Sequence, residues 1–215
     1  MNKHIEELNI LAEKYGTDKH LGKHGYVKHY AKLFHEIKNN NIKILEIGVQ
    51  EGWSHQMWHD YFPNGTIYGI DITPECKSIE NDRIKIEIGD QGDLNFLKDY
   101  GSRNGPFDII IDDGSHMVLH QITSLNVFFP FLKSGGTYVI EDLHTSFLPQ
   151  CLEGANTNFI EYSKQFANKV NTRGLLADNF ANVEKINKYY SYLDYFEQNI
   201  DMVSFAKSIC FITKQ

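Results

Sequence analysis

The sequence predicts an α/β protein with a doubly wound, mostly parallel sheet that ends in an antiparallel hairpin. Five short runs rich in Ile, Val and Leu stop at Gly or an acid between residues 42 and 142, which is typical of buried parallel strands. Segments with helical spacing of apolar residues alternate with these runs. Two further runs, 201–205 and 208–212, have only two residues between them. That connection is too short for a parallel crossover and predicts a hairpin, giving seven strands in all.

The first predicted strand, Ile42–Ile47, leads into a glycine-punctuated turn and then into a helix with an apolar face. Ser54 belongs to the residue types that cap helix N-termini, so we place the start of this helix there. A strand, a glycine turn and a helix in this order open nucleotide-binding α/β folds, whose ligand lies beyond the carboxyl end of the strand. We therefore predict a ligand site beside Gly48 and Gly52.

The glycine spacing narrows the choice of ligand. Dinucleotide sites use G-x-G-x-x-G, whose second Gly lets a pyrophosphate approach the backbone. Gln50 occupies that second position here, so no cradle for a pyrophosphate is evident. A ligand without phosphates, held by an acid at the strand end, fits better. S-adenosylmethionine is such a ligand, and Glu46 could face its cationic end.

Acidic residues also follow the second and third predicted strands. In the strand 66–72, Asp71 lies about 20 residues beyond the glycine turn, where an acid can accept hydrogen bonds from both hydroxyls of a ribose. In the strand 84–90 apolar and charged residues alternate, which is typical of a strand nearer the sheet edge. Asp90 or Gln91 at its end would lie near an adenine. The helix that follows is expected to open at 93–94.

Two helices are expected before the first strand, over residues 5–15 and 27–37, with Gly16 ending the first. They could cover a ligand cleft, although a solvated loop and an ordinary helix explain the same pattern. A further helix is predicted over 119–132 and is closed by the Lys-Ser-Gly-Gly run 133–136. We divide one domain, 1–215, into a helical cap (1–40), a cofactor-binding core (41–147), a helical and aromatic lid segment (148–198) and the hairpin (199–215).

Composition excludes several classes of protein. The net charge of −7 and the pI of about 5.8 argue against a sequence-independent grip on nucleic acid phosphates. No apolar run approaches membrane-spanning length, and the N-terminus has no apolar signal region. Three scattered cysteines suggest no disulfide framework. We expect a cytoplasmic protein that binds neither nucleic acid nor membrane.

Carboxylates concentrate at the ends of the fourth and fifth predicted strands. The strand 107–113 ends in two Asp residues, and the strand 136–142 ends in Glu-Asp. If these strands are neighbours, their tips lie about 5 Å apart, and like charges so close oppose ionisation unless a cation compensates. Oxygen ligands favour Mg²⁺, Ca²⁺ or Mn²⁺ over zinc. We assign Asp113, Glu141 and Asp142 to a metal, and Asp112 to the cofactor side.

His116 follows Asp113 by three residues, so its ring can lie beside the metal without being a ligand. An imidazole with a pKa of about 6.5 is suited to removing a proton from a hydroxyl. A metal bound to that hydroxyl would lower its pKa. The alternative is a packing histidine beside acids that only cap helices. We predict that His116 and Asp113 are catalytic.

Taken together, the segments 45–49, 68–72, 112–116 and 141–143 resemble the motifs of class I S-adenosylmethionine-dependent methyltransferases. Within that class the chain is most similar to metal-dependent O-methyltransferases that act on the sugars of macrolide antibiotics. Tyr15–Lys19 followed by His24–Tyr26 resembles the N-terminal motif of that group. The match covers roughly residues 15–147 and the final hairpin. Trp53 departs from the family pattern, which often has a second Gly there, and Phe147 stands where Tyr is common.

The resemblance implies an in-line methyl transfer from S-adenosylmethionine to a hydroxyl, with magnesium on Asp113, Glu141 and Asp142 and with His116 as general base. The acceptor it implies is a small molecule, a sugar or a nucleotide-linked or glycan precursor. The residues assigned to the cofactor are Thr17, Glu46, Gly48, Gly52, Ser54, Asp71, Asp90, Gln91 and Asp112.

Three questions stay open at this point. The same acids could hold redox-active iron in a small-molecule hydroxylase, or the chain could bind S-adenosylmethionine without catalysis. The aromatic residues of 156–196, including Tyr162, Phe166, Tyr189, Tyr190, Tyr192, Tyr195 and Phe196, could stack on a sugar, but helices packed on the sheet explain them slightly better. A homo-oligomer is possible, and the sequence does not decide it.

Overall fold

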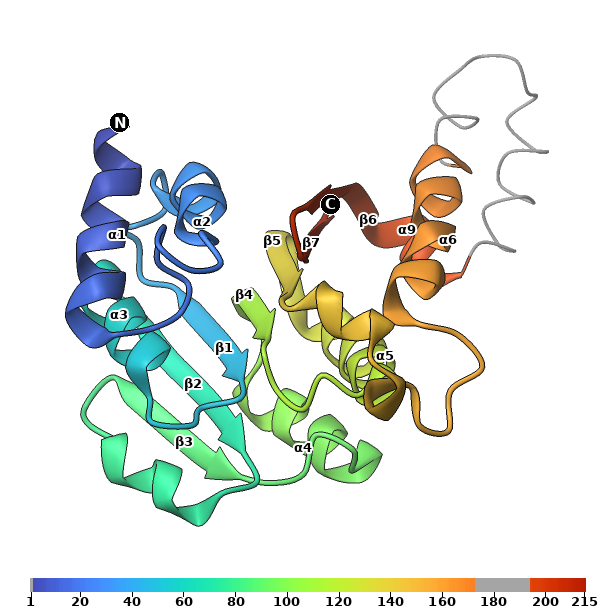
Figure 1. Ribbon diagram of the computed structural model, residues 1–215, viewed down its shortest axis with the longest axis horizontal. Helices are drawn as coiled ribbons and strands as arrows, with labels where there is room; N and C mark the ends of the chain where they lie inside the picture. The colour runs from blue at the N-terminus through green and yellow to red at the C-terminus, as the bar shows by residue number, and fades with distance from the viewer. Residues whose placement is uncertain (1, 173–193) are drawn as a thin grey trace.

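A seven-stranded sheet forms the centre of the computed structural model, which describes residues 2–172 and 194–215 (Figure 1). Its strand order is β3-β2-β1-β4-β5-β7-β6. The parallel strands are β1 (Lys43–Ile47), β2 (Thr66–Asp71), β3 (Ile84–Ile88), β4 (Phe107–Asp112) and β5 (Leu132–Ile140). The hairpin strands are β6 (Ile200–Ala206) and β7 (Ile209–Lys214), and β7 pairs antiparallel with β5. The predicted doubly wound sheet with a terminal hairpin is confirmed.

Helices cover both faces of this sheet. The helices α1 (Lys3–Tyr15), α2 (Val27–Phe34) and α3 (Trp53–Tyr61) pack on one face, and α4 (Leu94–Asn104), α5 (Val118–Phe128) and α6 (Phe159–Thr172) pack on the other. A short helix, α9 (Tyr195–Asn199), precedes β6. The 3-10 turns are η1 (Pro74–Ile79), η2 (Phe129–Phe131), η3 (Leu143–Phe147) and η4 (Pro149–Leu152).

Each face has its own core because successive side chains of a strand point to opposite sides of the sheet. In β1, Ile44 packs with α1, α2 and α3, whereas Leu45 and Ile47 pack with α4 and α5. Trp58 and Phe62, predicted as part of an apolar helix face, are fully buried in the first core. The sheet therefore lies between two separate cores.

Three predicted helix boundaries were wrong. The second helix ends at Phe34 rather than at residue 37. Ser54 lies inside α3, which begins at Trp53 after Gly52, and it does not cap the helix. The predicted helix 119–132 ends at Phe128 because Pro130 lacks an N–H and its ring would clash with the preceding turn. Residues 133–136, expected to close that helix, belong to β5.

Aromatic residues after β5 pack mainly into the second core. Phe166 of α6 is fully buried, and the ring of Phe196 lies 5.2 Å from the ring of Phe166 and 4.9 Å from that of Phe129. For these residues the structure favours helices packed on the sheet over a sugar-stacking lid. Tyr189, Tyr190 and Tyr192 lie outside the described residues.

Two further features bear on the sequence-based expectations. Cys76, Cys151 and Cys210 are buried and unpaired. Across residues 2–172 and 194–215, no helix has both the length and the apolar character needed to cross a bilayer.

Candidate active site

A cavity of about 440 Å³ opens at the carboxyl ends of β1, β2 and β4. We call it the strand-end cavity. Apolar walls come from Ile47, Ile70 and Ile72, and polar groups come from residues that include Asp90 and Gln91. This volume is typical of a small-molecule site. None of its lining residues, all within the described part of the chain, is Lys or Arg, so the cavity offers no ammonium or guanidinium group to a phosphate.

Asp71 holds the turn that follows β1. Its Oδ2 accepts hydrogen bonds from the backbone N–H groups of Val49 (2.8 Å) and Gln50 (3.0 Å), and its Oδ1 accepts one from Thr73 (2.8 Å). Burial acts to raise the pKa of Asp71, but the N–H donors of Gln50, Thr73 and Val49 outweigh it and lower the pKa. Asp71 is therefore a stable anion, and its Oδ1 keeps acceptor capacity at the wall of the cavity.

Gly48 brings this turn against the end of β4. Its φ of +94° lies in the left-handed region, and a Cβ there would lie 2.1 Å from the carbonyl oxygen of Asp113. Gly52 also has a left-handed φ, +76°, and a Cβ there would lie 2.3 Å from Cδ1 of Ile79, whose side chain would have to move. Gly48 lines the strand-end cavity, whereas Gly52 does not.

The residues assigned to the cofactor fall into three groups. Gly48, Asp71, Asp90 and Gln91 line the strand-end cavity. Thr17 and Ser54 line a smaller cavity of about 130 Å³, which we call the cluster cavity. Glu46, Gly52 and Asp112 line neither cavity. Their direct contact with a cofactor stays a prediction that the geometry does not favour.

Glu46 and Asp112 are both buried inside the protein. Trp58 donates its Nε1–H to Oε2 of Glu46 at 2.9 Å, and burial raises the pKa of Glu46 to about 7 although Lys19 acts to lower it. Gln91 donates to Oδ1 of Asp112 at 2.8 Å, and burial raises the pKa of Asp112 to about 6. Both carboxyls therefore form buried hydrogen bonds inside the protein near the ends of β1 and β4.

The predicted acidic cluster forms where β4 and β5 end side by side, with Asp112 in register with Ile140. One ligand atom each of Asp113, His116 and Asp142 lies within 4.8 Å of the others. Carboxylate oxygens with a single imidazole nitrogen are donors that suit a hard divalent ion. The chemistry of this donor set fits the implied magnesium. His116 is near enough to be a ligand, whereas the sequence placed it only beside the metal.

Glu141, the third predicted metal ligand, is linked to Asp113 by Lys19, whose ammonium group contacts both carboxylates. Nζ of Lys19 lies 2.5 Å from Oδ2 of Asp113, 2.8 Å from Oε2 of Glu141 and 3.5 Å from Oε1 of Glu46. The hydroxyl of Tyr30 donates to the other oxygen of Glu141. Both oxygens of Glu141 therefore have protein partners already.

Asp142 lies among a tyrosine and three histidines. Tyr26 donates its hydroxyl to Oδ1 of Asp142 at 2.7 Å. Nδ1 of His24 and Nδ1 of His144 each lie 4.0 Å from the same oxygen, and His116 approaches the other oxygen. The carboxylate of Asp142 therefore has neighbours from the N-terminal loop, Tyr26 and His24, and from the end of its own strand, His144.

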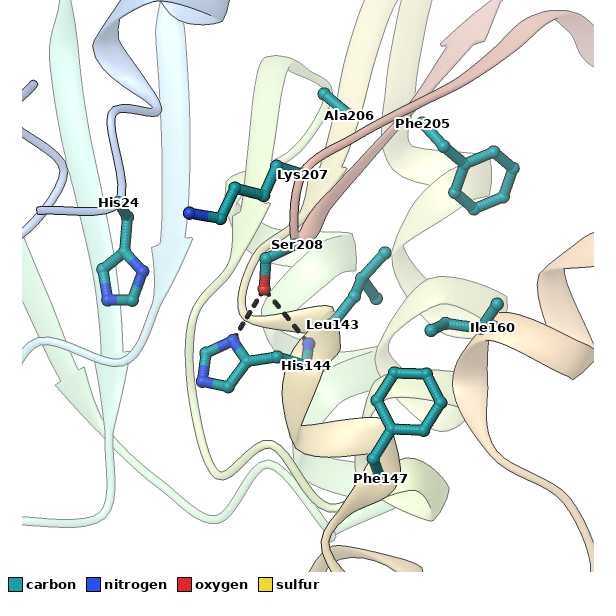
Figure 2. A pocket seen from close by; sticks show the side chains of 9 residues that line it. All are labelled: His24, Leu143, His144, Phe147, Ile160, Phe205, Ala206, Lys207 and Ser208. Carbon is teal, nitrogen blue, oxygen red and sulfur yellow. Dashed lines mark hydrogen bonds between the residues drawn. The ribbon is translucent and has the colours of Figure 1, made fainter.

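A third cavity, of about 590 Å³, borders this cluster beside the β6–β7 turn (Figure 2). We call it the hairpin cavity. Figure 2 shows one polar side, with His24, His144, Lys207 and Ser208, and one apolar side, with Leu143, Phe147, Ile160 and Phe205. Nδ1 of His144 lies 2.6 Å from the hydroxyl oxygen of Ser208, which links η3 to the hairpin.

Comparisons with known proteins identify relatives of this chain in sequence and in structure. No protein-family model matches the chain. Demethylmacrocin O-methyltransferase of Streptomyces fradiae is 41% identical over 151 residues, covering 66% of this chain and 38% of that protein. The solved structure of MycE methyltransferase from the mycinamycin biosynthetic pathway, in complex with Mg and SAH, superposes with a TM-score of 0.84 and 31% identity, covering 97% of this chain and 54% of that one. The chain belongs to the class I S-adenosylmethionine-dependent methyltransferases.

The chain is also similar to a second curated O-methyltransferase and to a second MycE structure. Mycinamicin VI 2''-O-methyltransferase of Micromonospora griseorubida is 40% identical over 151 residues, covering 66% of this chain and 37% of that protein. A further MycE structure, in complex with Mg, SAH and mycinamycin VI, superposes with a TM-score of 0.83 and 30% identity, covering 97% of this chain and 53% of that one. The chain thus spans about half or less of the length of the relatives it matches.

Sequence reasoning missed several residues of the candidate site. Lys19, Tyr26 and Tyr30 contact the acidic cluster directly, yet no role was assigned to them. Lys19 and Tyr26 do fall inside the N-terminal motif that carried the family resemblance, which was the available signal. Tyr30 has the helical spacing of the apolar residues of α2, and its ring is fully buried in the structure.

Proposed function

We propose that this protein is an S-adenosylmethionine-dependent, magnesium-dependent O-methyltransferase that modifies a hydroxyl of a sugar. One observation carries the proposal. Asp113 lines both the strand-end cavity and the cluster cavity, whereas His24 and His144 line the hairpin cavity and approach Asp142. The acidic cluster therefore lies between a cavity suited to the methyl donor and a cavity suited to the acceptor.

The strand-end cavity supports the choice of donor. It offers the carboxylates of Asp71 and Asp90, the amide of Gln91 and apolar walls, and its lining contains no Lys or Arg. A cationic sulfonium compound with an adenosine fits such a lining better than a phosphate-bearing dinucleotide. SAH, the demethylated product of that donor, is bound in the MycE structures.

The proposed metal ligands are Asp113 and Asp142, with Glu141 as the third. A divalent ion held there would lower the pKa of a nearby hydroxyl. We assign His116 as the base that accepts the proton, because it lines the cluster cavity beside Asp113 and Asp142. Asp142, whose Oδ2 lies 3.8 Å from Nε2 of His116, would stabilise the imidazolium that results.

The hairpin cavity supports an acceptor with two kinds of surface. Its polar side lies next to the acidic cluster and suits a sugar, and its apolar side suits a larger group attached to that sugar. Two relatives from Streptomyces species are named for acceptors of this kind, a rhamnosyl-tetracenomycin-C and an L-olivosyl-oleandolide. A nucleotide-linked acceptor, assembly into a homo-oligomer and a cytoplasmic location stay predictions from the sequence.

Calorimetric titration followed by turnover tests this function. We expect S-adenosylmethionine and its demethylated product to bind, and NAD not to bind. With Mg²⁺ present, methyl transfer should then occur to glycosides that carry an apolar group, and more slowly to the free sugars. Binding of NAD alone, or binding of the donor without turnover on any glycoside, would contradict the proposal.

A further inference from the structure

Lys19 is a buried cation at the centre of the acidic cluster. Its side chain is 2% exposed, and its ammonium group faces carboxylates that follow or belong to three strands: Glu46 in β1, Asp113 after β4 and Glu141 after β5. Among the described residues, no other Lys or Arg lies within 4.0 Å of these three carboxylates.

The remaining partners of Glu141 and Glu46 carry no charge. Tyr30 and Trp58 donate neutral hydrogen bonds to Glu141 and Glu46. His55 lies 3.5 Å from Glu46, and burial lowers the pKa of His55 to about 3, so its ring is neutral. Within this set Lys19 is the one group that offsets the negative charge of the carboxylates, which would otherwise repel one another at close range.

Lys19 also ties the N-terminal loop to the strand tips. The backbone carbonyl of Lys19 accepts a hydrogen bond from the N–H of Val27 at 3.1 Å, at the start of α2. Tyr26, the residue before Val27, donates to Asp142. One loop therefore supplies both the cation and a hydroxyl to carboxylates that end two neighbouring strands.

We propose that Lys19 is a positioning residue of the metal site, which neutralises part of the acidic cluster and holds Asp113 and Glu141 in place for one divalent ion. This inference rests on the proposed metal dependence. It goes beyond that proposal by assigning a charge-balancing role to a residue outside the acidic motif. Lys19 and the metal then compensate the same carboxylates, so the loss of one makes the protein depend more on the other.

Thermal unfolding of the full chain in EDTA and in a Mg²⁺ titration tests this role without any methyl transfer. We expect Lys19→Met to lower the melting temperature in EDTA by about 10 °C, because its removal leaves buried carboxylates unpaired. Mg²⁺ should then raise the melting temperature of Lys19→Met by more than it raises that of the wild type. Lys19→Arg should behave more like the wild type.

Lys77→Met is the matched control, since Lys77 is 55% exposed and forms a surface ion pair with Glu80. It should leave both melting temperatures unchanged. Equal Mg²⁺ responses of Lys19→Met and the wild type would show that Lys19 acts through packing alone, and would overturn the proposal. A wild type that does not respond to Mg²⁺ would overturn the metal assignment as well, but it would leave the donor titration untouched.

The double variant Lys19→Met/Glu141→Gln keeps the proposal testable if Lys19→Met alone does not fold. It removes one charge of each sign, so it should melt above Lys19→Met in EDTA. Recovery of a folded protein in the double variant alone would support the charge-balancing role. A double variant that melts no higher than Lys19→Met would overturn it.

Discussion

His116 and Asp142 face each other beyond the tips of β4 and β5, with Nε2 of His116 3.8 Å from Oδ2 of Asp142. Both residues have left-handed backbone, with φ of 58° and 52°, which is uncommon outside glycine. Such conformations cluster at functional sites, where the surrounding structure holds them in place. The pair is therefore the centre of the proposed chemistry.

Replacing His116 by Ala should abolish turnover while leaving the donor site intact. The residue lines the cluster cavity and does not line the strand-end cavity. We expect kcat to fall by about 10²- to 10⁴-fold, as is usual for the loss of a general base. The Kd of S-adenosylmethionine, measured by calorimetry, should not change. His4→Ala, on α1, serves as the control, and an unchanged kcat in His116→Ala would remove this residue from the mechanism.

Metal removal should stop the reaction reversibly. EDTA is expected to abolish methyl transfer, and Mg²⁺ should restore it, because Asp113 and Asp142 present oxygen donors to a hard ion. Asp142→Asn should require a higher Mg²⁺ concentration for half-maximal rate. Asp99→Asn is the control, since Asp99 pairs with Arg103 on the surface of α4. Full activity in EDTA would exclude the metal assignment.

Gly48→Ala should disturb the donor site through a steric clash. Its Cβ would lie 2.1 Å from the carbonyl oxygen of Asp113, so the turn and the end of β4 would have to separate. We expect a lower melting temperature and at least tenfold weaker binding of S-adenosylmethionine. Gly135→Ala is a matched control, because Gly135 also has a positive φ but a Cβ there meets nothing within 4 Å. Equal effects of both changes would rule out the close approach as the cause.

Ionisation of Glu46 should lower the free energy of unfolding as the pH rises toward about 7. Its pKa is about 7 in the folded state against an ordinary value of 4.5. A raised pKa means that the stabilising contribution is complete below about 4.5 and is lost as the pH rises through about 7. We expect the stability of the wild type relative to Glu46→Gln to fall by roughly 3 kcal/mol between these limits. Denaturant unfolding in EDTA measures this difference, and a pH-independent difference would contradict the account.

The hairpin cavity should select acceptors through its apolar side. Phe147 is 72% exposed and Phe205 is 50% exposed, and both line the cavity. Replacing either by Ala should raise KM for a glycoside with a large apolar group several-fold, because burial of an aromatic side chain against the acceptor is lost. The Kd of S-adenosylmethionine should stay the same. If KM for the free sugar rose equally, the apolar side would not be the cause.

Much of the site follows from the sequence because strand ends are easy to locate. Parallel strands carry their carboxyl ends to one edge of the sheet, so Asp71, Asp113 and Asp142 could be placed near a ligand from the apolar runs alone. The hairpin followed from the two residues between its strands. These features depend only on short-range patterns.

The remainder of the site depends on contacts that no local pattern records. The sequence predicts that Glu46 faces the cofactor, and no local pattern indicates that Trp58 and Lys19 approach its side chain on the α1–α3 face of the sheet. Lys19 itself looked like a solvated loop lysine, and only the fold brings it to carboxylates 94 and 122 residues further along the chain. Pro130 was visible in the sequence, yet its effect on the end of α5 was underestimated.

Anomalous diffraction from crystals grown with Mn²⁺ and SAH would locate the metal and the demethylated donor in one experiment. We expect one manganese peak in contact with Asp113 and Asp142, and SAH in the strand-end cavity with its sulfur directed toward that peak. A manganese ion bound elsewhere, or SAH outside the strand-end cavity, would contradict this expectation.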